Sequence, residues 1–209
     1  MKNRLYFACV AMFVMVGGLF TFFFEKGGAI LYFNDFHTAW ADIFFKYATK
    51  LGEEPVYVIV FLLYLGYRLR YSLLVAITGF SVMGVSYITK LFFGEDRPLA
   101  FFRKLNQEDV LNLVDGVKVY TGHTSFPSGH SMSAFALYSL LALLLPPRKR
   151  LGALLFITAF TVAFSRIYLV QHFLRDIYAG SLVGVALAIL IHWANSHLEY
   201  RPGNRIDQP

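Results

Sequence analysis

Charged side chains are scarce in this chain. Asp, Glu, Lys and Arg make up 15% of its 209 residues, whereas a typical soluble domain has about 25%. Hydrophobic residues reach 57% and aromatic residues 18%. This composition excludes an ordinary soluble domain and indicates an integral membrane protein, and the length fits a single domain over residues 1–209.

Cysteine is almost absent as well. The only one, Cys9, lies inside an apolar run. An intramolecular disulfide and a cysteine-based metal site are therefore excluded. The sequence also lacks low-complexity segments and obvious internal repeats.

Six apolar runs predict an all-α bundle of six transmembrane helices. They cover residues 5–24, 55–67, 71–93, 128–145, 151–164 and 177–193, and a spanning helix needs about 20 residues. The second run is short, so it spans only if its helix begins near Thr49 or if Arg68 snorkels. Because no small-residue cleavage pattern precedes Glu25, we expect the first run to be retained.

An amphipathic segment precedes the second run. Its apolar residues recur at helical spacing: Phe36, Trp40, Ile43, Phe44, Tyr47 and Leu51. This pattern predicts an amphipathic helix lying in the membrane interface. A short helix packed on the bundle is an equally good interpretation, and neither implies chemistry.

Lysine and arginine are concentrated on one side of the six expected spans. That side contains Lys2, Arg4, Arg68, Arg70, Arg148, Lys149, Arg150, Arg201 and Arg205, with only Glu199 and Asp207 as acids. The positive-inside rule then places both termini in the cytoplasm. The loop 94–126, the start of the fourth span and the segment 165–176 would all share the outer face. The net charge of +6 is explained by topology, and no nucleic-acid partner is expected.

The first cluster at this face contains Lys90 and Arg97. The two cations are seven residues apart, so they point the same way for as long as one helix continues. Pro98 limits that continuation, because a proline disfavours helical backbone in the residue before it. A snorkelling lysine and an arginine in a loop remain an alternative.

The second cluster is Pro127-Ser128-Gly129-His130. A proline in the first turn of a helix is well tolerated. The free N–H groups of a helix start bind anions, and Gly129 allows a close approach to the backbone. A plain helix cap explains Pro127 and Ser128 equally well, but it does not explain His130.

The third cluster lies between the last two spans and contains Arg166, His172 and Asp176. His172 and Asp176 are four residues apart, so on a helix they share one face and can hydrogen-bond. A histidine held by a carboxylate is the usual form of a base or nucleophile near neutral pH. Arg166 adds planar donors that suit phosphate oxygens. A polar patch where a helix leaves the bilayer is the alternative.

Together the three clusters bring cations, a helix start and two histidines to one membrane face. Lys90, Arg97 and Arg166 cannot share a membrane rim without an anion to neutralise them. Phosphate fits by charge and geometry, and so would sulfate or vanadate.

The three clusters resemble, in order and spacing, the three-part signature of the type 2 phosphatidic acid phosphatase superfamily. The signature covers residues 90–176 without departure. The resemblance implies a membrane lipid phosphatase that uses neither a metal nor a cofactor. It implies that His172 attacks phosphorus to form a phosphohistidine, that Asp176 orients His172, and that His130 protonates the leaving oxygen. The implied phosphate-binding residues are Lys90, Arg97, Ser128, Gly129 and Arg166.

The sequence leaves the substrate and the oligomeric state open. The expected partners are a lipid phosphate and the membrane lipids of a bacterial inner membrane. The family's bacterial substrates include undecaprenyl diphosphate, phosphatidylglycerophosphate, phosphatidic acid and the lipid A 1-phosphate, and an outward-facing site slightly favours the first. The alternative is an anion transporter or channel lined by Lys90, Arg166 and Asp176. Depth distinguishes the two, because residues of a transport path should lie near the bilayer midplane. The loop 99–126 is either a lid or an interfacial anchor.

Overall fold

The computed structural model describes residues 3–199, and within this range every regular element is a helix. The α-helices are α1 (Arg4–Phe23), α2 (Gly28–Asn34), α3 (Ala39–Ala48), α4 (Glu54–Leu65), α5 (Leu69–Phe93), α6 (Pro98–Lys104), α7 (Gly129–Leu144), α8 (Lys149–Tyr168) and α9 (Leu174–Glu199). Two short 3-10 helices are η1 (Thr49–Gly52) and η2 (Glu108–Val110). The predicted all-α class is confirmed.

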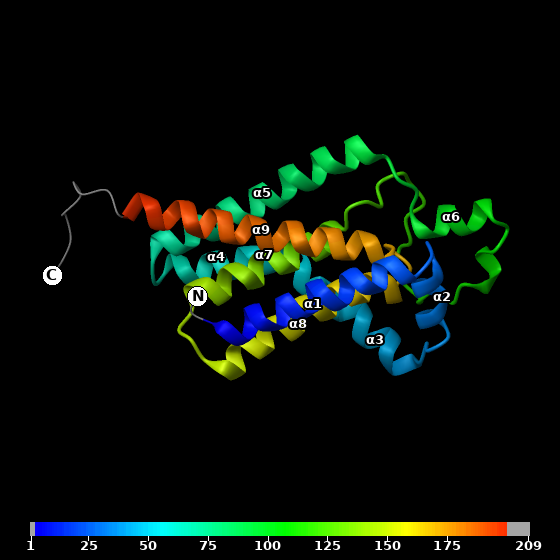
Figure 1. The fold of residues 1–209 in the computed structure, drawn as a ribbon, viewed down its shortest axis with the longest axis horizontal. Coiled ribbons are helices and arrows are strands. Elements are labelled where there is room, and N and C mark those ends of the chain that lie inside the picture. The colour runs from blue at the N-terminus through cyan, green and yellow to red at the C-terminus, as the bar shows by residue number, and fades with distance from the viewer. Residues whose placement is uncertain (1–2, 200–209) are drawn as a thin grey trace.

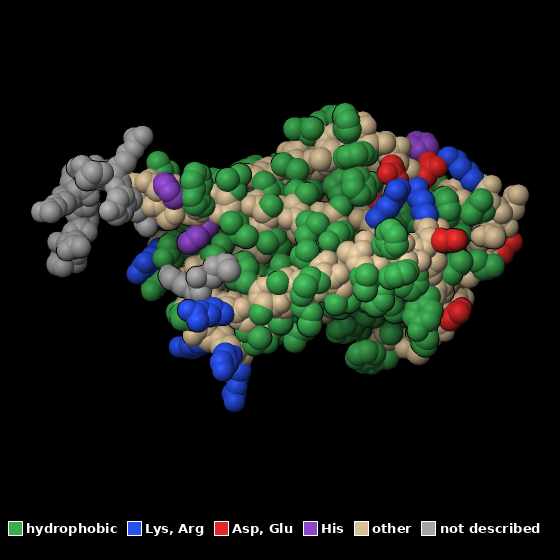
Figure 2. Space-filling model, in the orientation of Figure 1, with side chains coloured by type: hydrophobic (Ala, Val, Ile, Leu, Met, Phe, Trp, Pro, Cys, Tyr) green, Lys and Arg blue, Asp and Glu red, His purple; other side chains and the backbone are tan. Residues whose placement is uncertain are grey.

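Helices α1, α4, α5, α7, α8 and α9 run along the length of the molecule, and α2, α3 and α6 gather at one end (Figure 1). The start of α1 and the end of α9 lie at the opposite end. Helix α7 is enclosed, since almost all its side chains are buried. The surrounding helices carry large apolar side chains on their outer surfaces, which cover the face shown in Figure 2. An exposed apolar surface of this extent is stable in lipid and not in water.

Helix length divides the six expected spans into two groups. Helices α1, α5, α8 and α9 are long and apolar enough to cross a membrane, while α4 and α7 are shorter apolar helices. The twelve residues of α4 cover about 18 Å at 1.5 Å per residue. A helix starting near Thr49 would be longer, but the backbone of Glu53 is extended (φ −93°, ψ 166°) and separates η1 from α4.

The amphipathic segment forms a shorter helix than the spacing of its apolar residues predicts. Helix α3 begins after Thr38, whose side chain accepts a hydrogen bond from the N–H of Ala41, and ends at Ala48. Trp40 and Ile43 are exposed. Asp42 accepts a hydrogen bond of 2.6 Å from the hydroxyl of Tyr168 at the end of α8. Ala41 and Phe45 also pack against the bundle, so the face of α3 that contacts it carries both Asp42 and apolar side chains, while Trp40 and Ile43 point outward.

Helices α7 and α9 approach each other closely at two glycines. A methyl group at Gly180 would lie 2.4 Å from the carbonyl oxygen of Ser128, and one at Gly184 would lie 2.3 Å from that of Met132. Real atoms do not approach so closely, so only glycine permits this contact. It places the second and third turns of α9 against the start of α7.

Charge is distributed unevenly along the bundle. On the face shown in Figure 2, Asp and Glu gather at the end formed by α2 and α6, while Lys and Arg lie at both ends. Lys2, Arg201, Arg205 and Asp207, which enter the charge count above, lie outside the described residues, as does the side chain of Glu199.

Candidate active site

His172 and Asp176 meet at the turn between α8 and α9. The expectation that they share one helix is wrong, because α8 ends at Tyr168 and α9 begins at Leu174. Val170 takes the left-handed conformation (φ 55°), and the N–H of His172 donates to the carbonyl of Arg166 at 3.0 Å. The turn still brings Nδ1 of His172 to 3.5 Å from Oδ2 of Asp176, and both side chains are buried.

The carboxylate of Asp176 is held from two further directions. Its Oδ2 accepts hydrogen bonds from the hydroxyl of Ser125 at 2.5 Å and from the N–H of Phe173 at 3.0 Å. Ser125 is fully buried. It was missed at the sequence level, because a single serine in a polar loop gives no periodic signal.

The second cluster forms the start of α7. Ser128 is the N-cap, and its hydroxyl accepts from the N–H of Ser131 at 3.3 Å. The first helical residue is Gly129. Pro127 therefore lies two positions before the helix, and its predicted place in the first turn is wrong. A methyl group on Gly129 would lie 3.4 Å from Nζ of Lys90. The backbone at the start of α7 therefore lies beside a cation, which suits an anion.

Arg97 does not continue the helix that carries Lys90. Gly94 adopts the left-handed conformation (φ 54°) and ends α5, while Arg97 caps α6, of which Pro98 is the first residue. The shared helical face expected for the two cations is therefore wrong. Arg97 reaches the site through the loop, where its Nη1 donates to the carbonyl of Gln171 at 3.3 Å.

Arg166 is buried near the end of α8 and carries one unpaired donor. Its Nη1 donates to the hydroxyl of Thr49 at 2.7 Å. Among the described residues, its Nε has no hydrogen-bond partner. A buried guanidinium donor without a partner is costly. It is therefore free to bind an anion.

The charges of the three clusters converge on His172. Burial lowers the pKa of His172 well below its ordinary value, and the positive charges of Arg97 and Arg166 lower it further. The imidazole is therefore neutral at neutral pH, with Nδ1 toward Asp176.

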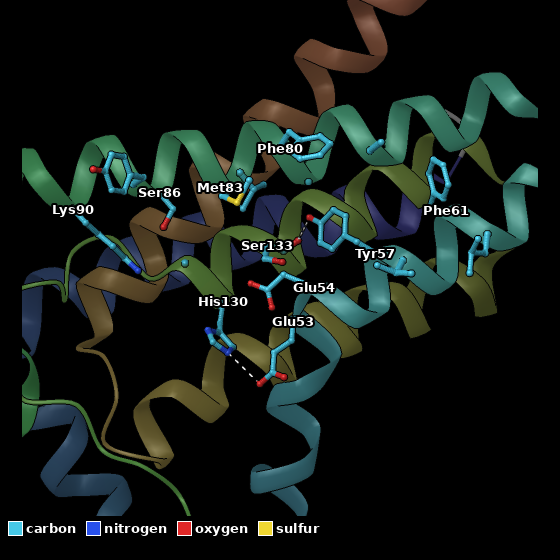
Figure 3. A pocket seen from close by; sticks show the side chains of 18 residues that line it. Glu53, Glu54, Tyr57, Phe61, Phe80, Met83, Ser86, Lys90, His130 and Ser133 are labelled. Atoms are coloured by element: carbon cyan, nitrogen blue, oxygen red, sulfur yellow. Dashed lines mark hydrogen bonds and ion pairs between the residues drawn. The ribbon is translucent and has the colours of Figure 1, made fainter.

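A cavity of about 820 Å³ runs between α4 and α5 to this site. Figure 3 shows Tyr57, Phe61, Phe80 and Met83 along its walls, with Lys90 and His130 at one end. Gly129 lines the same end, whereas His172 and Arg166 do not line the cavity. An elongated apolar molecule with an anionic end fits a space of this shape and lining.

The loop between α6 and α7 covers the turn that carries His172. Gln171 donates from Nε2 to the carbonyl of Lys118 at 3.0 Å, and the guanidinium of Arg97 lies 5.1 Å from the ring centre of Tyr120. Two other basic residues contact acidic side chains outside the site. Nδ1 of His123 lies 2.5 Å from Oδ1 of Asp96, and the guanidinium of Arg175 pairs with the carboxylate of Glu95.

The fold and the site together define a class of protein: an all-helical membrane bundle with buried cationic side chains near the end of an apolar cavity. The sequence matches the PAP2 superfamily over residues 61–199, which is more than half of the chain. The chain therefore belongs to the PAP2 superfamily, and its long apolar helices mark it as a membrane protein.

Named relatives agree with this assignment. The chain is 28% identical over 163 residues to the lipid A 4′-phosphatase of Bacteroides thetaiotaomicron, a match that covers 74% of this chain and 70% of that protein. It is 36% identical over 76 residues to the bacitracin transport permease protein BcrC of Bacillus licheniformis, covering 36% of each chain. The match therefore spans about a third of that relative.

A solved structure shares the fold. The crystal structure of Aquifex aeolicus LpxE superposes with a TM-score of 0.68 at 24% identity, covering 82% of this chain and 97% of that one. At this identity the similarity establishes the fold alone.

Proposed function

We propose that the protein hydrolyses a phosphate group from a membrane lipid through a phosphohistidine at His172. The observation that carries this proposal is the buried contact between Nδ1 of His172 and Oδ2 of Asp176, held by Ser125. This contact leaves Nε2 as the nucleophilic nitrogen. Burial is the main cause of the lowered pKa of His172, and the neutral imidazole keeps the lone pair of Nε2 available for attack.

The reaction has two steps. In the first, Nε2 of His172 forms a bond to phosphorus as the bond to the lipid oxygen breaks, and His130 donates a proton to that oxygen. In the second, His130 takes a proton from water, the water oxygen attacks phosphorus, and the N–P bond breaks to release phosphate. Asp176 stabilises the charge that develops on the imidazole.

Side chains and backbone supply the positive charge that the transition state needs. Lys90, Arg97 and Arg166 would bind the equatorial oxygens, together with the hydroxyl of Ser128 and the N–H of Gly129. Within residues 3–199, no three His, Cys, Asp or Glu side chains converge in a way that suits a metal ion. The donor set here is cationic, which supports catalysis without a metal.

The apolar cavity favours a lipid as substrate, because its walls would cover the chain while the phosphate reaches Lys90 and His130. We propose six spans with both termini in the cytoplasm of a bacterial inner membrane, α3 in the interface and the site on the outer side. The basic residues at the starts of α5 and α8, at the end opposite α2 and α6, support this orientation: Arg68, Arg70, Arg148, Lys149 and Arg150. An outward-facing site favours undecaprenyl diphosphate among the four bacterial lipids.

A membrane transporter is the second candidate, favoured by the word permease in the name of the relative BcrC. A transport path needs its charged residues near the middle of the membrane. Lys90, Arg166 and Asp176 instead lie at helix ends, in the last turns of α5 and α8 and the first turn of α9. This placement favours the phosphatase.

The deciding experiment measures phosphate release by the purified protein from undecaprenyl diphosphate, phosphatidylglycerophosphate, phosphatidic acid and lipid A 1-phosphate, each in the presence of EDTA. We expect release from at least one lipid and none from His172→Ala. Anion flux through vesicles without phosphate release would overturn the proposal. Activity that EDTA abolishes and Mg²⁺ restores would overturn its metal-free form.

A further inference from the structure

The residues from Thr49 to Glu53 contact two members of the site from outside the family's signature. They form η1 and the cap of α4. They also precede the range 61–199 that matches the PAP2 superfamily. Their contacts are therefore a feature of this chain that the family match does not describe.

Thr49 fixes the plane of the Arg166 guanidinium. Its buried hydroxyl accepts the 2.7 Å hydrogen bond from Nη1 of Arg166. Because the guanidinium is rigid and planar, a hydrogen bond at Nη1 also constrains the direction of its other N–H donors. The unpaired Nε of Arg166 then keeps a fixed direction.

Glu53 holds the imidazole of His130. Its Oε1 lies 3.5 Å from Nε2 of His130, and Figure 3 shows the two side chains facing each other at the end of the cavity. The hydrogen bond with His130 is the main reason that the pKa of Glu53 is lowered. The charged groups near His130 are Arg166 on α8, Lys90 on α5 and Glu53 itself, and Glu53 is the only anion among them.

Gly52 locks this segment between α7 and α8. A methyl group there would lie 2.6 Å from Cγ1 of Val162 on α8 and 3.1 Å from the carbonyl oxygen of His130 on α7. The valine is β-branched and stiff. The backbone between Thr49 and Glu53 therefore packs closely against both helices, which fixes the positions of these two residues.

We propose that Thr49 and Glu53 are positioning residues of the active site: Thr49 orients Arg166 toward the phosphate, and Glu53 orients His130 and favours the protonated form that donates to the leaving oxygen. This inference rests on the proposed function, in which Arg166 binds phosphate and His130 is the general acid. It adds a fourth segment, residues 49–53, to the three signature clusters.

The test of Glu53 is the pH dependence of phosphate release by Glu53→Gln. Glutamine keeps the shape but removes the charge that favours protonated His130. We expect the basic limb of kcat/KM to move to lower pH by about one unit. The control is Glu54→Gln, which removes the same charge at the neighbouring position and should shift the limb by less than half as much. Equal shifts, or no shift, would overturn the role of Glu53.

The test of Thr49 is inhibition by vanadate, which probes the phosphate position without turnover. Thr49→Val removes the hydroxyl at nearly constant volume, and we expect the inhibition constant to rise about tenfold. Thr49→Ser should restore the wild-type constant, because it retains the acceptor. An unchanged constant in Thr49→Val, or no rescue by serine, would overturn the role of Thr49.

His172→Ala separates this inference from the function on which it rests. If His172→Ala is inactive and both Thr49→Val and Glu53→Gln behave as wild type, the phosphatase proposal stands and the positioning proposal fails. If His172→Ala retains full activity, the phosphohistidine mechanism itself fails. Thermal unfolding of each detergent-purified variant identifies any loss that comes from misfolding, and the serine variant then decides for Thr49.

Discussion

The backbone N–H of Ser128 donates to the backbone carbonyl of Asp176 across 3.0 Å, which joins the start of α7 directly to the first turn of α9. Ser128 belongs to the second signature cluster and Asp176 to the third. This main-chain bond therefore holds the proposed phosphate-binding helix start in register with the carboxylate beside His172. The glycine contact between the same helices makes that bond possible.

Gly180→Ala tests this relationship. The added methyl group would lie 2.4 Å from the carbonyl oxygen of Ser128 and must push α9 away from α7. We expect a loss of about 1–3 kcal/mol in stability, seen as a lower thermal midpoint in detergent, and a lower kcat. Gly84→Ala on α5 is the matched control, because a methyl group there has nothing within 4 Å. Equal effects of the two variants would contradict the close packing.

Ser125→Ala tests how Asp176 is held. Removing the hydroxyl leaves Oδ2 of Asp176 with one fewer donor and less able to orient His172. We expect kcat to fall roughly 10- to 100-fold, as for other hydrogen bonds to a charged group. Thr158→Ala is the control, since that exposed hydroxyl bonds only the carbonyl of Leu154 in its own helix. A kcat within twofold of wild type would show that Ser125 does not position Asp176.

The pH profile tests the electrostatics of His172. Its pKa is depressed mainly by burial, and only the neutral form attacks phosphorus. The midpoint of the acid limb of kcat/KM should therefore lie below about pH 6.5, the ordinary pKa of histidine. Activity should persist as the pH drops through that value and disappear only at lower pH. An acid limb above it would contradict a buried nucleophile beside cations.

Met83→Trp tests whether the cavity binds the lipid chain. Met83 lines the cavity, and the larger ring would fill part of it. We expect KM for a long-chain lipid phosphate to rise about tenfold, equivalent to losing two buried methylene groups, while KM for a water-soluble phenyl phosphate stays unchanged. Ile88→Trp on α5, exposed and outside the cavity lining, should change neither constant. A parallel rise for both substrates would argue against chain binding.

The helices were predictable because each apolar run is local. The helix ends were less predictable. The span expected at 55–67 is α4 (Glu54–Leu65), and the longer helix from Thr49 does not form, since the extended backbone at Glu53 separates η1 from α4. Helix α3 is shorter than the apolar pattern, because Thr38 caps it.

The structure brings the three signature clusters together, as their order along the expected spans predicts, but two geometric arguments for them were wrong. Lys90 and Arg97 lie on different helices because Gly94 turns the chain, and His172 lies outside α9. The left-handed Val170 that allows this turn is unfavourable for a β-branched residue.

Supporting residues were missed because their partners are distant in sequence. Thr49 and Arg166 are 117 residues apart, and Ser125 and Asp176 are 51 apart. No local pattern reports such a contact. Only packing of the helices brings these side chains together.

The central claim is that His172 carries the phosphoryl group during turnover. The most direct measurement mixes the enzyme with lipid labelled in its terminal phosphate, quenches the mixture in base within one turnover, and follows label on the denatured chain. Phosphohistidine survives base and is released by acid, so the account predicts base-stable, acid-labile label on the wild type and none on His172→Ala. Turnover without retained label, or label retained by His172→Ala, would contradict it.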